Sequence, residues 1–296
     1  MKKNNDFVLG VSFSIINSIS LGILGVVDKI GAGHFSSTIV FSTQSVFFSY
    51  LFVTAFALIF YKTTLLHQVS TLSFSVLKYI ILVGIFASGL FVLFRFLGLT
   101  QSTGTFATLG QVVITAETAI LALLFIREKL SGKFWLLFML ILIAMYFVSV
   151  GAFKLAPLHP GDSFIIAGAS FVAIANIFSK LAVNKVNPVV LSEGRFLFGL
   201  LFLLLITLLF FHQVNLFTFS IWSIISGLFW AVNVIAFNFA IKKIGVTFAT
   251  SLLMIAPIYT MILEFVILKQ TFNLLQIVAA LVVVICGILM VVVKNK

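Results

Sequence analysis

The sequence Thr-Phe-Ala-Thr occupies residues 105–108 and recurs in the same order at residues 247–250. Each copy opens an apolar run, and the two runs align at a constant offset of 142 positions, the distance from 105 to 247. At this offset Thr115 aligns with Pro257, and Glu128 aligns with Gln270. The alignment predicts a duplicated half, and a duplicated half in a membrane protein is typical of transporters.

The composition places the chain in a bilayer. It is 62% hydrophobic and 8% charged, whereas a soluble domain is about 25% charged. Most of its apolar runs are long enough to cross a hydrocarbon core of about 30 Å. The net charge of +11 does not indicate nucleic-acid binding, because the lysines lie in the breaks between apolar runs. The single cysteine, Cys286, excludes an internal disulfide.

Short polar breaks divide the chain into candidate helices. Lys2 and Lys3 precede an apolar stretch that is too long for a signal peptide, so we interpret it as a retained membrane helix. We expect an all-α membrane protein with ten transmembrane helices, at about residues 7–27, 38–60, 79–99, 106–126, 134–152, 164–183, 189–211, 220–241, 247–268 and 274–293.

The distribution of basic residues predicts the orientation. With the N-terminus inside, 14 of the 18 Lys and Arg residues fall on the cytoplasmic side, in the breaks or near the cytoplasmic ends of the spans, and only Lys29, Arg95, Lys154 and Lys269 lie on the other side. This bias predicts a multi-pass protein of the cell (inner or cytoplasmic) membrane with both termini in the cytoplasm.

Five helices per half is an odd number, so the second half must insert upside down relative to the first. We therefore expect two inverted-topology five-helix repeats, at residues 1–153 and 160–296. More loosely, residues 27–29 align with 178–180, and residues 94–96 align with 237–239. Inverted repeats place a substrate site near the midplane, between halves that rock about it.

This organisation resembles the EamA-type transporters of the drug/metabolite transporter superfamily. The resemblance rests on Ala-Pro-Ile at 256–258, on residues 125–130 around Glu128, and on Glu-Gly-Arg-Phe at 193–196. The chain departs from the family pattern at Thr115, at Gln270 and at Ser45, which stands at a family arginine position. The resemblance implies a secondary transporter of a small organic metabolite, with export the commoner direction. It also implies a central cavity lined by helices one, three, four, six, eight and nine.

Glu117 is the first functional candidate, because it lies near the middle of the fourth predicted helix. An acidic residue at the bilayer centre costs about 3 kcal/mol unless it faces a cavity or a partner, and such residues often mark proton or cation pathways. We therefore name Glu117 as a proton-coupling candidate. The alternative is a structural carboxyl bonded to Arg95 or to a neighbouring hydroxyl.

Four other charged residues have open roles. Arg95 is expected to snorkel to the headgroups, to pair with Glu117 or Glu264, or to clamp a carboxylate substrate. Glu264 is a candidate for substrate contact or for an ion pair with Arg95 or Lys269. Arg195 is read mainly as a packing and orientation residue. Glu128 is a structural or gating residue by resemblance, or a headgroup-level partner for its basic neighbours.

Uncharged groups inside the spans extend the list of candidates. The polar members, for which interhelical hydrogen bonding is the alternative, are Asn17, Gln111, Asn176 and Asn233. Trp230 and Tyr259 could form an aromatic wall for a ring or a quaternary ammonium group, with simple packing as the alternative. Pro257 predicts a kink or hinge in the ninth helix.

Three acidic residues, Asp6, Asp28 and Asp162, fall at predicted span ends, where we expect solvated caps. No cluster has the spacing of metal ligands, and no phosphate-binding loop or catalytic triad is present, so we expect no metal, no cofactor and no enzymatic activity. The expected partners are the bilayer and a small solute such as an amino acid, an amine or a related zwitterion or cation. Proton coupling and a homodimer are left open, and nucleic acid is excluded. A flippase subunit for lipids or lipid-linked carriers is the alternative function.

Overall fold

The computed structural model describes residues 2–33, 37–99, 101, 104–128, 130–153, 160–211, 216 and 218–295. No strand occurs among them, as the all-α prediction requires. The helices are α1 (Lys2–Gly33), α2 (Thr38–Phe60), α3 (Lys62–Ser70), α4 (Phe74–Val83), η1 (Gly84–Leu90), α5 (Phe91–Leu99), α6 (Gly104–Leu121), η2 (Ala122–Ile126), α7 (Gly132–Val150), α8 (Asp162–Val183), α9 (Pro188–Phe210), α10 (Ile221–Ile244), α11 (Val246–Leu253), α12 (Ala256–Leu268) and α13 (Leu274–Asn295).

Eight helical segments in the described part of the chain are long and apolar enough to cross a membrane. Two shorter apolar helical stretches, Val112–Ile126 in α6 and η2 and Gly132–Val148 in α7, overlap the predicted spans 106–126 and 134–152. The structure thus confirms an all-helical protein with eight candidate spans, and the count of ten stays a prediction.

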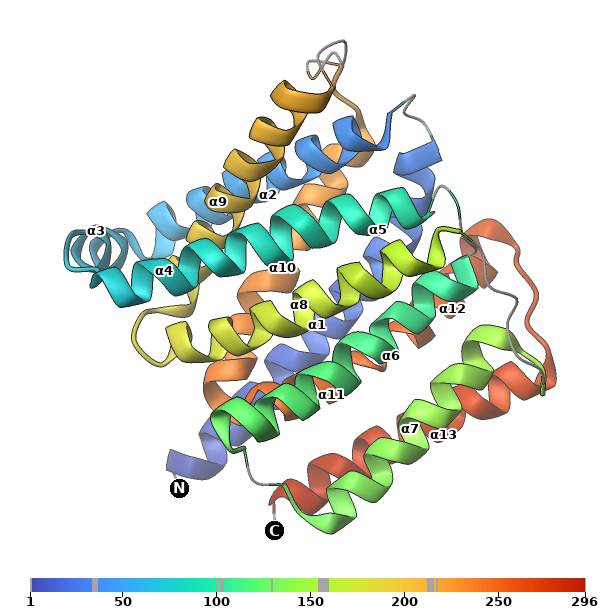
Figure 1. Cartoon of the computed structure of the whole chain (residues 1–296). Helices are drawn as coiled ribbons and strands as arrows, with labels where there is room; N and C mark the ends of the chain where they lie inside the picture. The colour runs from blue at the N-terminus through green and yellow to red at the C-terminus, as the bar shows by residue number, and fades with distance from the viewer. Residues whose placement is uncertain are drawn as a thin grey trace.

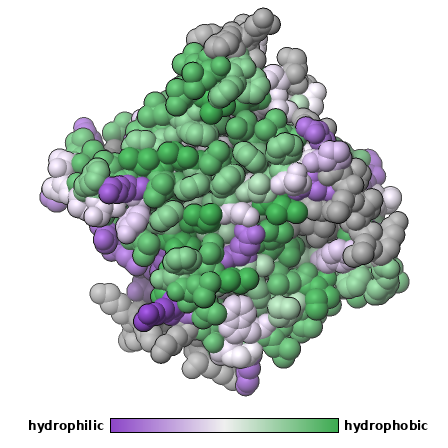
Figure 2. Space-filling view, viewed as in Figure 1, coloured by the Kyte–Doolittle hydropathy of each residue, from purple (hydrophilic) through white to green (hydrophobic). Residues whose placement is uncertain are grey.

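Hydrophobic residues dominate the face of the molecule drawn in Figure 2. Large apolar side chains such as Phe60, Leu124, Phe210 and Leu281 are more than half exposed. Exposed apolar surface of this extent indicates contact with lipid rather than with water.

The long helices pack in a layered bundle (Figure 1). α1 packs against α10 and against α11 and α12, whereas α8 packs against α4 and α5 and against α6. α2 contacts both α9 and α10. α7 and α13 pair with each other at one edge of the bundle, and the two termini lie at the same end of it (Figure 1).

Glycines permit two of the closest helix contacts. A Cβ atom added at Gly84 would lie 2.6 Å from the Cβ atom of Phe198, so η1 and α9 approach within backbone contact. At Gly22 an added Cβ would lie 2.4 Å from the Cβ atom of Tyr259, where α1 crosses α12. Small residues at such crossings are a general device of membrane helix packing.

Three spans in the described part of the chain depart from a regular α-helix. The third contains the π-helical segment η1, and the fourth ends in the π-helical segment η2. Such segments often mark functional positions. The ninth is interrupted between α11 and α12, and Pro257 lies in the first turn of α12. The structure therefore confirms the predicted interruption, which follows from the missing backbone donor of proline.

The expectation of solvated caps at Asp28 and Asp162 is wrong. α1 continues to Gly33, beyond the predicted end at residue 27, so Asp28 lies within the helix and is 1% exposed. Asp162 begins α8 and is 3% exposed. Asp6 is half-buried and pairs with Lys243 of α10.

Candidate functional site

A small cavity lies where α2, η1, α5, α9 and α10 meet. Its volume is about 10 Å³, roughly enough for one water molecule. The lining includes Ser45, Ser88, Arg95, Arg195, Phe196 and Trp230. Two arginine residues, Arg95 and Arg195, therefore border one space inside the helical bundle. A solute larger than water requires these helices to separate.

Arg95 forms an ion pair with Asp28 of α1. Its Nη2 lies 3.4 Å from Asp28 Oδ2, while the Ser226 hydroxyl donates a 2.7 Å hydrogen bond to Asp28 Oδ1. The guanidinium also lies 5.8 Å from the ring centre of Trp230 and 5.9 Å from that of Phe91, which is cation–π geometry. The partner of Arg95 is thus neither Glu117 nor Glu264.

Asp28 is a residue that the sequence reasoning missed as a partner for Arg95. The signal that could have found it is the loose alignment of residues 27–29 with 178–180, which lie inside the sixth predicted span. That alignment places Asp28 inside a helix as well.

Arg195 extends from α9 to the π-helical turn η1. Its Nε donates a 3.1 Å hydrogen bond to the Ser88 hydroxyl, and Nη2 donates a 3.4 Å bond to the Ala87 carbonyl. The residue is 5% exposed. No carboxylate forms an ion pair with it among the described residues. The nearby Glu193 instead accepts from Thr54, at 3.4 Å.

Glu117 lies apart from the lining residues of this cavity. It is half-buried in α6, and the Ser170 hydroxyl of α8 donates a 3.0 Å hydrogen bond to its Oε1. This geometry matches the alternative of a carboxyl bonded to a neighbouring hydroxyl. It also places a titratable group between α6 and α8, two helices that pack together.

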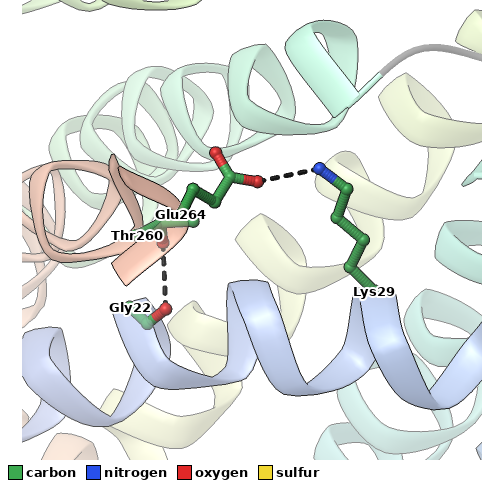
Figure 3. A network of polar contacts seen from close by, with 4 residues as sticks. All are labelled: Gly22, Lys29, Thr260 and Glu264. Atoms are coloured by element: carbon green, nitrogen blue, oxygen red, sulfur yellow. Dashed lines mark hydrogen bonds and ion pairs between the residues drawn. The ribbon is translucent and has the colours of Figure 1, made fainter. Parts of the chain in front are cut away.

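Glu264 of α12 forms an ion pair with Lys29 of α1 (Figure 3). Its Oε1 lies 3.0 Å from Lys29 Nζ, and one turn earlier the Thr260 hydroxyl donates a 3.0 Å hydrogen bond to the Gly22 carbonyl. Neither of the predicted partners, Arg95 and Lys269, forms the pair. Glu264 is thus part of the polar contacts that join α12 to α1.

Glu128 is hydrogen-bonded to Thr247 of the second half, at the opposite end of the bundle. Its Oε2 accepts from the Thr247 hydroxyl at 2.7 Å and from the Thr247 backbone N–H at 3.1 Å. Because Thr247 is in the first turn of α11, the carboxylate caps that helix. Thr247 is the first residue of the second Thr-Phe-Ala-Thr copy, and Glu128 follows the span that contains the first copy. A hydrogen bond therefore joins the two aligned spans.

The uncharged polar candidates form interhelical hydrogen bonds. The Asn17 amide donates to the Asn233 carbonyl at 2.6 Å, and the Asn233 amide donates to the Asn17 carbonyl at 3.1 Å. This reciprocal pair joins α1 to α10. The Asn176 amide donates to the Thr118 hydroxyl at 3.1 Å and joins α8 to α6. These contacts agree with the structural alternative for the three asparagines.

The remaining candidates are dispersed. Trp230 lines the cavity beside Arg95, whereas Tyr259 is half-buried at the crossing of α12 with Gly22 of α1. Gln111 belongs to α6, but its side chain lies outside the described residues. The structure brings Arg95, Arg195 and Trp230 together and leaves Glu117 and Glu264 elsewhere.

Comparisons with known proteins bear on the family and on the fold. Residues 159–293 match the model of the EamA-like transporter family. A search of curated proteins gives no match. Among solved structures, a chain titled only "Crystal structure of protein" is similar with a TM-score of 0.75 at 15% identity, over 94% of each chain. That similarity concerns the fold alone.

Proposed function

We propose that this multi-pass membrane protein is a secondary transporter of a small organic metabolite, because residues 159–293 match the model of the EamA-like transporter family. It works by alternating access between two inverted five-helix halves, residues 1–153 and 160–296, which together span the membrane ten times. Both termini lie in the cytoplasm, and the membrane is the cell membrane.

The observation that carries this proposal is a set of backbone contacts repeated at the sequence offset of 142. The fourth span ends at Arg127 with φ 56°, and the ninth ends at Lys269 with φ 55°. The next N–H in each case bonds back six residues at 3.2 Å, from Glu128 to Ala122 and from Gln270 to Glu264. A helix end of this kind is common by itself, and the support for a duplicated half is that both ends fall at the offset of the repeated sequence.

The following helices also begin alike. The Ser131 hydroxyl accepts from the N–H of Phe134 at the start of α7, and the Asn273 side-chain oxygen accepts from the N–H of Gln276 at the start of α13. Both pairs keep the spacing of 142 residues, and both are N-terminal caps. The structural correspondence therefore extends over the end of one span and the start of the next.

Helix packing supports the same relationship. If the halves correspond in order, the packing of α1 on α10 is the counterpart of α8 on α4 and α5. Similarly, α1 on α11 and α12 is the counterpart of α8 on α6. α2 and α9 are the second spans of the two halves, and α7 and α13 are the fifth, so each of these packed pairs is unchanged when the halves are exchanged. Such an exchange is what a pseudo-two-fold axis in the membrane plane produces.

Two polar contacts between helices, one at each end of the bundle, would act as the gates. Glu128 with Thr247 closes the end near the termini, and Lys29 with Glu264 closes the other end. Alternating access then consists of breaking one contact while the other holds. Proton coupling is assigned to Glu117, because acidic residues inside membrane spans often mark proton pathways and this carboxyl lies between α6 and α8, where it accepts from Ser170.

The solute is an amino acid, an amine or a related zwitterion or cation, and export is the proposed direction. The test uses purified protein in vesicles with an imposed pH gradient and a panel of labelled amino acids, amines and nucleosides. We expect saturable flux of one chemical group of solutes in vesicles with protein and none in empty vesicles. Absence of flux for the whole panel, with flipping of a fluorescent lipid, would contradict the proposal.

A further inference from the structure

Arg195 is a buried cation inside a membrane span. It donates hydrogen bonds to a hydroxyl and to a backbone carbonyl and lies 6.0 Å from the ring centre of Phe196, and no carboxylate pairs with it in the described part of the chain. A buried charge is costly unless a counter-charge compensates it, and the cost rises in a bilayer. The site therefore favours an anionic group close to Arg195.

Two further donor groups at the same cavity lack partners. Ser45 Oγ and Arg95 Nε are both buried and have no hydrogen-bond partner within the described residues. Ser45 is 3% exposed, and both residues line the cavity together with Arg195. Unsatisfied buried polar atoms are rare in folded proteins and call for a specific explanation. A ligand with acceptor oxygens would satisfy all three groups.

The charges around the cavity exclude a cation as the group that binds there. Asp28 balances Arg95, and Asp28 is not among the residues that line the cavity. Arg195 remains as an unbalanced positive charge. An ammonium group placed here would be repelled, whereas a carboxylate would receive two N–H donors in the fork geometry that guanidinium groups favour.

Both halves of the chain contribute to these donors. Ser45 lies in α2 and Arg195 in α9, and the two helices pack against each other. Trp230 and Phe196 supply apolar walls. A group bound between the halves is held by residues that would move relative to one another in alternating access.

We propose that the cavity between Arg195, Arg95 and Ser45 binds the carboxylate group of the transported solute, with Arg195 as the main donor. This inference rests on the proposed transport function and narrows its solute class to carboxylates, including zwitterions. Because the cavity of about 10 Å³ holds one water-sized group, binding requires α9 and η1 to move apart.

The test measures the unfolding temperature of the purified protein in detergent with three probes of similar size. Propionate carries the carboxylate alone, alanine carries carboxylate and amine, and alanine methyl ester carries the amine alone. We expect saturable stabilisation by propionate and alanine, and none by the ester. Sodium chloride at equal ionic strength separates carboxylate binding from binding of any small anion, and we expect no stabilisation by it.

Variants then locate the site. Arg195→Gln should weaken the apparent affinity for propionate about ten-fold or more, and Arg195→Lys should give an intermediate loss because it keeps the charge but not the fork. Lys62→Gln is the matched control, since it removes the same charge from an exposed position, and it should bind like the unmodified protein. If Arg195→Gln does not fold, Ser45→Ala provides the same test with a smaller expected loss.

Three results would overturn the carboxylate site: no saturable effect of propionate, equal stabilisation by chloride, or unchanged affinity in every Arg195 and Ser45 variant that folds. The assay is independent of flux. Solute flux in vesicles without propionate binding would refute the site and leave the transporter standing. Propionate binding without any flux would support the site and count against the transport function.

Discussion

Asp28 of α1 and Arg95 of α5 form an ion pair inside the helical bundle, with Asp28 Oδ2 3.4 Å from Arg95 Nη2. The carboxylate is 1% exposed and also accepts from Ser226 of α10. Three helices from the two halves of the chain are therefore joined through one carboxylate.

Loss of Arg95 should destabilise the protein strongly. Arg95→Gln leaves the buried carboxylate of Asp28 without its counter-charge, and breaking a buried pair in this way costs about 3–5 kcal/mol. Adding Asp28→Asn should restore most of the loss, because neither partner is then charged. The measurement is the free energy of unfolding in detergent for the two single variants and the double variant.

Lys29→Gln is the control for this comparison of single and double variants. Lys29 is adjacent to Asp28, but its side chain is 53% exposed in the pair with Glu264, so its loss should cost less than about 1 kcal/mol. Additive effects of Arg95→Gln and Asp28→Asn would show that the two residues do not depend on each other.

Replacement of Glu117 should separate proton coupling from folding. In Glu117→Gln the amide oxygen can still accept from Ser170, so the fold and solute exchange at equal pH should persist. Accumulation driven by a pH gradient should be lost, because the amide carries no titratable proton. Ser170→Ala keeps the carboxyl and should still respond to the gradient. Normal gradient-driven accumulation by Glu117→Gln would remove this residue from the coupling mechanism.

The bond between Glu128 and Thr247 should govern access from one side. Glu128→Ala removes the acceptor of both Thr247 donors, so the end of the bundle near the termini should open more often. In a Cys286→Ser background, a cysteine replacing the buried Ser251 of α11 should then react several-fold faster with an impermeant maleimide.

The label is added to the side of the membrane on which the termini lie. Glu264→Ala weakens the polar contact at the other end and should not accelerate labelling from this side. Equal labelling rates with and without Glu128 would mean that its bond to Thr247 is no gate.

Two glycines of α1 should tolerate alanine very differently. At Gly22 the added methyl group would lie 2.4 Å from Tyr259 Cβ and 3.0 Å from the Ala256 carbonyl oxygen, so α1 and α12 would have to separate. We expect a loss of about 1–3 kcal/mol, the usual effect of overpacking. Gly33 has no atom within 4 Å of its added Cβ, and Gly33→Ala should be close to neutral. Comparable unfolding temperatures for the two variants would contradict the close crossing.

The sequence predicted the helical architecture because apolar runs, polar breaks and an interrupting proline are local signals. The interruption before Pro257 follows from one missing backbone donor, and it was predicted correctly. The end of the first helix was not, because Asp28 and Lys29 resemble a polar boundary when read along the chain. Only its partners on other helices show that Asp28 is buried.

The partners of charged residues could not be predicted for the same reason. Arg95 had two candidate acids in the sequence, yet it pairs with a third on α1. Glu193 and Arg195 face different neighbours, as their spacing of two residues indicates, but the sequence did not identify Thr54 and the turn η1 as those neighbours. Residue spacing restricts neighbours along one helix, whereas these contacts depend on how several helices are arranged.

The fourth and ninth spans end with the same backbone turn, but different side chains follow it. Glu128 accepts two hydrogen bonds from Thr247, whereas its counterpart Gln270 is exposed. In the proposed alternating-access cycle, one end would be closed by the carboxylate cap and the other by the pair between Lys29 and Glu264. Because these closures differ in chemistry, we expect the inward-facing and outward-facing forms to differ in free energy. The empty carrier would then have a resting orientation, and its affinity for solute would depend on the side from which the solute is offered.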